Sequence, residues 1–338
     1  MTEKERLIQT LSGKRVDRPP VICPGGMMTM ASREVMAMTD CRWPEVHRDA
    51  GRMATLSGAM RDQSGLENLG IPFCMTVEAE ALGGEIEDGD EVTEPSIVSY
   101  PLQSVAEWRN LRPLDPYRDG RLPTILECTE RLARERPDTP VMGNLVGPLS
   151  LGTSLLDAVT LFRALRLEAA EAHSLLSFLT DNICRYGQAL AERGADVIVI
   201  ADPSATGEIL GPRMFGDFAL PYLNRITERM HALGVPVIVH ICGKVKSVYG
   251  QLNLLATECI SVDSVVSMKE AKQALTGKRL MGNVSTALLQ KGPIEVIRKI
   301  SRLILNQGVD ILAPACGISA LTPVQNLKAM TEVAKGLS

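Results

Sequence analysis

Val235-Pro-Val-Ile-Val-His-Ile-Cys-Gly-Lys244 is a strand-like stretch that ends in two residues able to bind a metal. Its apolar, mostly β-branched beginning at 235–239 is typical of a short buried strand. His240 and Cys242 follow where this strand ends, and residues two apart in a strand point to the same side. An imidazole and a thiol can therefore converge on one point, and Gly243 lets the chain turn away after them.

Seven other stretches share this pattern of a short apolar run followed by a helical segment. The clearest is 194–202, Gly-Ala-Asp-Val-Ile-Val-Ile-Ala-Asp, whose continuous apolar character indicates a parallel strand covered on both faces. The eight expected strands lie at about 20–23, 70–76, 140–145, 194–202, 235–239, 259–263, 279–283 and 309–312. Eight strand–helix units predict an α/β fold of the (β/α)8 TIM-barrel type, in one domain spanning 1–338.

Helical periodicity fills the segments between these strands. A capping box at Thr2 and Glu5 predicts an N-terminal helical extension at 2–11, and the region 85–100 is typical of a hairpin. Further helices are expected at about 45–63, 102–111, 123–135, 155–193, 212–233, 245–256, 269–275, 294–307 and 322–335. The segment 155–193 is so long that we expect a break in it.

Polar residues stand at or just past the carboxyl ends of five expected strands. They are Asp202, His240, Asp263, Asn283 and Cys316. Barrels keep their chemistry at this end, so the positions favour a barrel. An open doubly wound sheet would also gather them at one edge, and it stays the alternative.

Composition limits the class of protein. The chain is 45% hydrophobic and 22% charged, as in soluble globular proteins, and its net charge of −4 gives no electrostatic reason to bind nucleic acid or an anionic membrane. No run approaches the ~18 apolar residues of a membrane span, and the charged N-terminus predicts no signal peptide. Eight scattered cysteines suit a reducing cytoplasm.

The donors His240, Cys242 and Cys316 are those that zinc prefers. Three protein ligands leave the fourth tetrahedral position open, as in catalytic rather than structural zinc sites. Two thiolates and a neutral imidazole make the bound site formally neutral, so that it can accept a substrate thiolate. The donor set therefore indicates alkylation of sulfur more than hydrolysis.

A second interpretation of the same residues needs no metal. Cysteines are often small buried hydrophobes, and a lone histidine is often a hydrogen-bonded core residue. The placement of both Cys segments at the ends of barrel strands favours the metal interpretation.

Four motifs carry a resemblance to a known family. They are Val239-His-Ile-Cys-Gly-Lys, Ala201-Asp-Pro-Ser-Ala-Thr-Gly-Glu-Ile-Leu-Gly-Pro, Met281-Gly-Asn-Val-Ser and Ala313-Pro-Ala-Cys-Gly. The chain resembles the methylcobamide:coenzyme M methyltransferase branch of the uroporphyrinogen decarboxylase family. The resemblance runs from Asp17-Arg-Pro-Pro to the final helix.

The resemblance implies a (β/α)8 barrel with a zinc site formed by His240, Cys242 and Cys316. It also implies a reaction in which a zinc-bound thiol acceptor attacks the methyl group of a methylated corrinoid on a partner corrinoid protein. The decarboxylase branch instead uses an Asp and Arg residues near the N-terminal strands. Here the first strand leads into Cys23-Pro-Gly-Gly-Met27, without arginine, which disfavours porphyrin decarboxylation.

Other polar residues receive supporting roles. We expect Asp202 and Asp263 to orient ligands or the incoming thiol, or to be hydrogen-bonding residues of the barrel mouth. Glu78 is a candidate fourth zinc ligand, or a solvated loop residue. Candidate substrate-binding residues are Glu78, Asn144, Ser204, Asp263 and Asn283. We expect the remaining histidines, at 47, 173 and 231, on the surface of helices.

The sequence leaves the methyl acceptor open between coenzyme M, another thiol and a pterin. Two other functions also stay open. One is the decarboxylase itself, and the other is a non-catalytic barrel that binds a corrinoid or tetrapyrrole.

Overall fold

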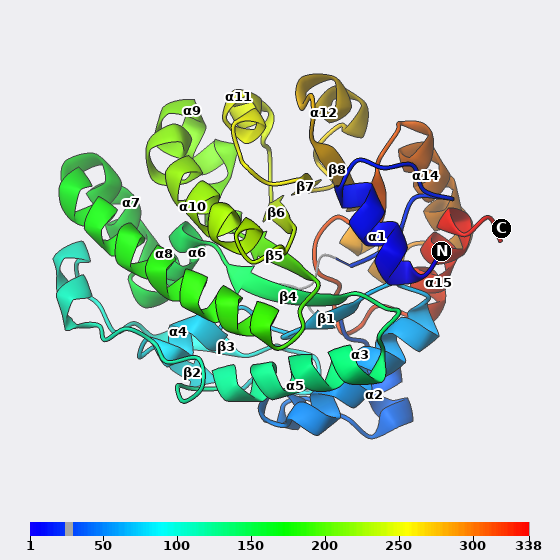
Figure 1. The fold of residues 1–338 in the computed structure, drawn as a ribbon, viewed down its shortest axis with the longest axis horizontal. Coiled ribbons are helices and arrows are strands. Elements are labelled where there is room, and N and C mark those ends of the chain that lie inside the picture. The colour runs from blue at the N-terminus through cyan, green and yellow to red at the C-terminus, as the bar shows by residue number, and fades with distance from the viewer. Residues whose placement is uncertain (24–29, 338) are drawn as a thin grey trace.

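The computed structural model describes residues 1–23 and 30–337 as a curled parallel sheet surrounded by helices (Figure 1). Seven strands form this sheet in the order β1-β4-β5-β6-β7-β8-β9, and all neighbours pair in parallel. The strands are β1 (Leu69–Ile71), β4 (Val141–Val146), β5 (Val197–Ala201), β6 (Val237–Ile241), β7 (Cys259–Val262), β8 (Arg279–Val284) and β9 (Ile311–Pro314).

Residues 20–23 close the sheet into a barrel by bonding to both of its edges. On the β9 side, the Ile22 amide donates to Leu312 at 3.1 Å and the Leu312 amide donates to Pro20 at 3.0 Å. On the β1 side, the Glu67 amide donates to Val21 at 2.8 Å. This segment is the eighth barrel strand that the sequence predicts, although it forms a single β-bridge, from Val21 to Leu312.

A helix follows each of the eight strands and packs outside the barrel, as the alternation of the sequence predicts. In chain order these helices are α3 (Ala50–Ser64), α5 (Leu122–Glu135), α8 (Ala169–Glu192), α10 (Leu220–His231), α11 (Tyr249–Asn253), α12 (Met268–Ala274), α14 (Ile294–Asn306) and α15 (Val324–Ala334). Figure 1 shows α5, α8 and α10 along the outside of the green strands. The (β/α)8 fold is thus confirmed.

Shorter elements fill the connections. The helices are α1 (Glu3–Leu11), α2 (Arg33–Thr39), α4 (Val77–Ala81), α6 (Pro148–Leu155), α7 (Ala158–Leu167), α9 (Gly207–Phe218) and α13 (Thr286–Lys291). The 3₁₀ turns are η1 (Glu45–Arg48), η2 (Val105–Asn110), η3 (Pro203–Ala205) and η4 (Lys246–Val248). The expected hairpin is present as β2 (Glu85–Glu87) and β3 (Ser96–Ser99).

The barrel interior is apolar at the end away from the carboxyl ends of the strands, and α1 packs onto this end. Strand side chains alternate between the interior and the surrounding helices, so every second residue faces inward. Leu7 and Leu11 of α1 join these inward residues in one buried cluster with Ile22, Met142, Val197, Val199, Ile238, Cys259, Met281, Ile311 and Ala313. The capping box of Thr2 and Glu5 is present and fixes the start of α1.

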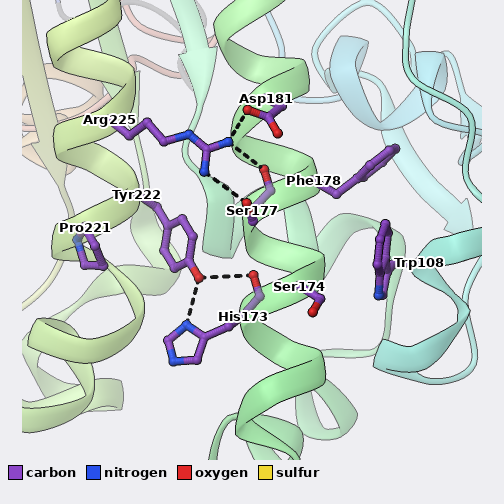
Figure 2. A pocket seen from close by; sticks show the side chains of 9 residues that line it. All are labelled: Trp108, His173, Ser174, Ser177, Phe178, Asp181, Pro221, Tyr222 and Arg225. Carbon is purple, nitrogen blue, oxygen red and sulfur yellow. Dashed lines mark hydrogen bonds and ion pairs between the residues drawn. The ribbon is translucent and has the colours of Figure 1, made fainter.

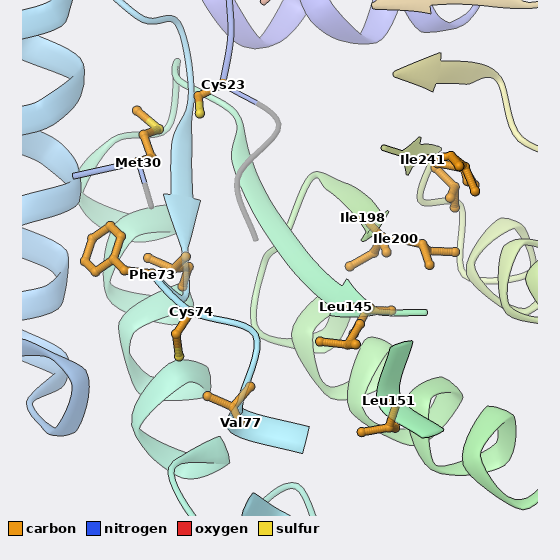
Figure 3. Close-up of a cluster of buried hydrophobic side chains, with 14 of the residues drawn as sticks. Cys23, Met30, Phe73, Cys74, Val77, Leu145, Leu151, Ile198, Ile200 and Ile241 are labelled. Atoms are coloured by element: carbon orange, nitrogen blue, oxygen red, sulfur yellow. The ribbon is translucent and has the colours of Figure 1, made fainter. Parts of the chain in front are cut away.

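The outward strand residues pack against the helices in a second and larger core. Figure 3 shows part of it, including Leu145 of β4, Ile198 and Ile200 of β5, and Leu151 of α6. These residues are fully or almost fully buried. Apolar side chains on both faces explain why the central strands read as continuous apolar runs.

Several local predictions are wrong. The second strand ends at Ile71 rather than near residue 76, and the following residues turn into α4, which carries Glu78. The segment between the expected strand at 140–145 and the expected helix at 155–193, for which no helix was predicted, contains α6, which begins at Pro148. The predicted break in the long helical segment is real and falls at Glu168, between α7 and α8.

The glycine-rich segment 24–29, into which the first expected strand leads, lies outside the described residues. Within the described residues, no helix has both the length and the apolar character to cross a membrane.

A buried ionic network holds the barrel closure in place. Glu67 is 1% exposed and accepts from Arg6 at 3.3 Å, from Arg18 at 3.0 Å and from the Val21 amide at 3.2 Å. Arg6 also bonds to Asp17 at 2.8 Å, and this bond lowers the pKa of the Asp17 carboxyl well below its usual range. The network joins α1, the segment before the first barrel strand and the start of β1.

We expect Glu67→Ala to lower the free energy of unfolding by about 3–5 kcal/mol, because it leaves two arginines without their buried partner. Urea unfolding followed by circular dichroism measures this change. The matched control is Glu171→Ala, which breaks an exposed pair with Arg109 and should cost about 1 kcal/mol or less. An equal decrease in the free energy of unfolding in both variants would contradict a role of Glu67 in closing the barrel.

Candidate metal centre

The ends of two barrel strands, β6 and β9, carry the three predicted metal ligands. His240 lies within β6, Cys242 follows one residue after this strand, and Cys316 follows two residues after β9. All three therefore stand at the carboxyl end of the barrel. His240 is fully buried, whereas both cysteines are partly exposed.

The three side chains converge. The Nε2 atom of His240 lies 3.1 Å from Sγ of Cys242, which lies 3.4 Å from Sγ of Cys316. The three ligand atoms all lie within 4.8 Å of one another, and they form a group of described residues able to hold a metal ion. The contact between the two thiols lowers the pKa of Cys316 and raises the pKa of Cys242.

The donor set and its spacing fit zinc. Tetrahedral zinc with its usual bond lengths places two thiolates about 3.8 Å apart, and an imidazole nitrogen about 3.6 Å from each thiolate. The distances of 3.4 and 3.1 Å are shorter by a few tenths of an ångström, so a small outward shift makes room for the ion. A tetrahedral ion held by these three residues would keep one position for a further ligand.

Asp202 follows β5, as predicted, but its carboxylate binds the start of α6. Oδ1 accepts from the Ser150 amide at 2.9 Å and from the Ser150 hydroxyl at 2.6 Å, and Oδ2 accepts from the Leu149 amide at 3.2 Å. Burial raises the pKa of Asp202 to about 6, and these hydrogen bonds partly oppose the rise. Asp202 thus holds α6 against the end of β5.

The surroundings of Asp202 explain two further residues. A Cβ on Gly147 would lie 2.3 Å from the Cβ of Asp202, so this close approach requires glycine. The Ser204 amide donates to the Ser150 hydroxyl at 3.0 Å, and the Ser204 hydroxyl lies 3.2 Å from that of Thr153. The candidate substrate residue Ser204 therefore belongs to the same network as Asp202.

Glu78 is a buried carboxyl group on α4. Its Oε1 accepts from the Val146 amide at the end of β4, at 2.8 Å, and the side chain is 1% exposed. Burial raises its pKa to about 7, and the bond from Val146 opposes this rise. A solvated loop position, one of the two expectations for Glu78, is therefore wrong.

The two candidate asparagines are buried and hold backbone around the mouth. Asn144 donates to the Ile71 carbonyl at 2.6 Å, and its Oδ1 is buried without a partner among the described residues. Asn283 donates to the carbonyls of Asp263, at 2.9 Å, and Val266, at 2.8 Å. Both asparagines thereby fix loops close to the strand ends.

Asp263 supports the ligand segment from the neighbouring strand end. Its Oδ2 accepts from the Gly243 amide at 3.1 Å, directly after the ligand Cys242. Ser261, two residues earlier on β7, bonds to Nδ1 of His240 at 2.9 Å. The role of Ser261 was not predicted from the sequence. A polar residue in the buried strand 259–263, two positions before Asp263, was the available signal.

The remaining histidines do not join the metal group. His47 lies in η1 and is fully buried, so the predicted surface position is wrong. Burial lowers the pKa of His47 to about 3. The other two are partly exposed, at 173 and 231.

A groove of about 770 Å³ lies on the outside of the barrel between α8 and α10 (Figure 2). Its polar side chains bond to one another: the Tyr222 hydroxyl lies 2.7 Å from Nδ1 of His173, and Arg225 bonds to Ser177 and Asp181. The groove is lined by Trp108, His173, Ser174, Ser177, Phe178, Asp181, Pro221, Tyr222 and Arg225. It contains none of the metal-binding side chains.

Comparison with known proteins gives consistent matches over the whole chain. A family model described as Uroporphyrinogen decarboxylase (URO-D) matches residues 2–337. The chain is 34% identical to a methylcobamide:CoM methyltransferase (MtbA) of Methanosarcina acetivorans, over 99% of this chain and 98% of that protein. It is 32% identical to a methylcobamide:CoM methyltransferase (MtaA) of Methanosarcina barkeri, over 97% and 96%.

The solved structure of a methyltransferase from Methanosarcina mazei is also similar. It superposes with a TM-score of 0.93 at 30% identity and covers 99% of both chains.

The environment of Asp202 predicts a pH-dependent effect on stability. A carboxyl whose folded pKa is raised from 3.8 to about 6 binds its proton more tightly in the folded chain, so its ionisation destabilises the fold as pH rises through this range. Asp202→Asn removes the titration. It also leaves amide donors of α6 poorly paired, at a cost of about 1–3 kcal/mol.

We therefore expect the stability advantage of the wild type over Asp202→Asn to shrink between pH 4 and 6 and to stay constant above that range. Urea unfolding of both proteins at closely spaced pH values measures the difference between their free energies of unfolding. The contributions of the titrating groups that both proteins share cancel in this difference. A difference that stays flat from pH 3.5 to 6.5 would show that the environment of Asp202 does not raise its pKa.

Proposed function

The chain belongs to the uroporphyrinogen decarboxylase (URO-D) family, and we propose that within it the chain is a methyltransferase that moves a methyl group from a methylated corrinoid to a thiol acceptor such as coenzyme M. Similarity to methylcobamide:CoM methyltransferases over nearly the full length supports this proposal. The observation that carries it is the convergence of His240, Cys242 and Cys316 at the open end of the barrel.

The proposed metal is zinc, with His240, Cys242 and Cys316 as its ligands. Zinc held there would lower the pKa of an acceptor thiol and keep its sulfur available as a nucleophile. In the transfer a sulfur–carbon bond forms and the cobalt–carbon bond breaks, with its electron pair left on cobalt. The thiol proton goes to solvent. The partial exposure of both cysteines lets a donor approach this side of the site.

Other residues of the mouth are proposed to position the reactants. Asp202 keeps α6 in place beside the site through its bonds to Leu149 and Ser150. The proposed substrate-binding residues are Glu78, Asn144, Ser204, Asp263 and Asn283. Of these, Asn144 offers a buried Oδ1 that lacks a partner among the described residues and can accept a hydrogen bond from a substrate.

The proposed methyl donor is carried by a partner corrinoid protein. A macrocycle is too large for the packed barrel interior, so it has to approach the mouth from outside. We place the reaction in the cytoplasm, because eight scattered cysteines suit a reducing compartment.

We expect about one zinc per chain in protein purified without chelators, and clear loss of zinc in Cys316→Ser. Elemental analysis measures both. Cys184→Ser, which changes a partly exposed cysteine on α8 outside the metal group, is the control and should keep its zinc. Wild-type protein that takes up no zinc would rule out this mechanism.

We expect the zinc-loaded protein to methylate coenzyme M with free methylcobalamin, followed by the absorbance change of the corrinoid. Cys242→Ser and Cys316→Ser should lower the rate by about a hundredfold or more, because they remove ligands that stabilise the thiolate. Thiols and pterins tested in parallel identify the acceptor. Turnover of uroporphyrinogen that resists chelators would point to the decarboxylase, and corrinoid binding without transfer would point to a binding barrel.

A further inference from the structure

We infer that Ser261 is a positioning residue of the metal centre: it accepts the Nδ1 proton of His240 and so orients the imidazole with Nε2 toward the metal. This inference rests on the proposed function, because it assumes that His240, Cys242 and Cys316 bind a metal. It concerns a residue that contacts a ligand and not the metal itself.

The two nitrogens of His240 face different partners. Nε2 lies 3.1 Å from Sγ of Cys242, on the side of the two thiols, and Nδ1 lies 2.9 Å from Oγ of Ser261. A neutral imidazole that binds a metal through Nε2 carries its proton on Nδ1. His240 and Ser261 are both fully buried, so this proton has to be accepted by a protein group.

Strand register places Ser261 opposite His240. β6 and β7 pair in parallel with His240 next to Ser261 and Ile241 next to Val262. Because inward residues recur every second position, the next inward pair on these strands is Cys242 and Asp263. Asp263 bonds to the Gly243 amide, directly after Cys242. Ser261 on β7 thus contacts His240 on β6, and Asp263 just after β7 contacts the backbone that follows Cys242 just after β6.

This arrangement differs from a hydrogen bond that only adds stability. Hydrogen-bonding partners of metal-binding histidines set the ring orientation and raise the basicity of the ligand, and their loss typically weakens metal binding 10- to 100-fold. A merely structural bond would change the unfolding transition and leave the affinity and electronic spectrum of the metal unchanged. Measurements of metal affinity and of the metal's spectrum therefore distinguish a positioning role of Ser261 from a purely structural one.

The test compares Ser261→Thr with Ser261→Val, which have the same shape and differ in the hydroxyl group. Zinc affinity is measured by competition with a chromophoric chelator, and cobalt(II) loaded in place of zinc reports the ligand geometry through its visible absorption. We expect Ser261→Thr to bind zinc close to the wild-type affinity and Ser261→Val to bind it about 10- to 100-fold more weakly, with a shifted cobalt spectrum.

The control is Ser301→Ala, which removes a buried hydroxyl that donates to the Ile297 carbonyl within α14, at 2.8 Å. It should leave both metal measurements unchanged. Near-ultraviolet circular dichroism of each metal-free variant reports whether it folds, and Ser261→Ala serves in place of Ser261→Val if the larger side chain prevents folding.

Equal zinc affinities and identical cobalt spectra for Ser261→Thr and Ser261→Val would overturn the inference. If His240→Ala nevertheless loses its zinc, His240 is a metal ligand, and the proposed function stands although the inference on Ser261 fails. If instead neither the wild type nor any variant binds zinc, both the proposed function and this inference fail.

Discussion

The hydrogen bonds of residues 20–23 to strands on both sides are the constraint on which the rest of this structure depends. They connect the two edges of a seven-stranded sheet, and closure fixes which side chains face inward. Glu67 anchors this segment through two arginines and the Val21 amide. Residues close to the N-terminus thereby complete the barrel whose strand ends carry the candidate metal ligands far along the chain.

Closure divides the barrel interior into two zones along its axis. The zone next to α1 is apolar and well packed, and it contains Met142, Ile238 and Met281. Two positions further along the same strands, polar residues replace them: Asn144, His240 and Asn283. Every second residue of a strand faces inward, and each lies further along the barrel axis than the one before. A change from apolar to polar inward residues along a strand is therefore a change in the polarity of the interior with depth. A rigid apolar base beneath a polar mouth suits chemistry that requires fixed ligands.

The strands were predictable because parallel strands buried on both faces leave a continuous apolar signal, as in 197–201. The convergence of His240, Cys242 and Cys316 was predictable because each donor ends such a run. Contacts across strands were not predictable in this way. The role of Ser261 depends on the register between β6 and β7, and the role of Asp202 depends on Ser150, which is distant in sequence.

Short helices were the main failure of the fold prediction. α4 and α6 have only 5 and 8 residues, too few for a clear periodicity, and Glu78 and Asp202 are oriented by them. His47 was misplaced for a related reason. Its burial follows from the packing of η1 beneath Trp43 and not from any pattern in the local sequence.

The packing of α1 onto the apolar interior also has a kinetic consequence. Leu7 and Leu11 cover the end of the barrel opposite the cysteines, so the triad is reached from the end where the cysteines stand. In the transfer proposed above, both reactants would have to use this one end. We therefore expect a large donor seated there to slow the entry of a small thiol and the release of its product.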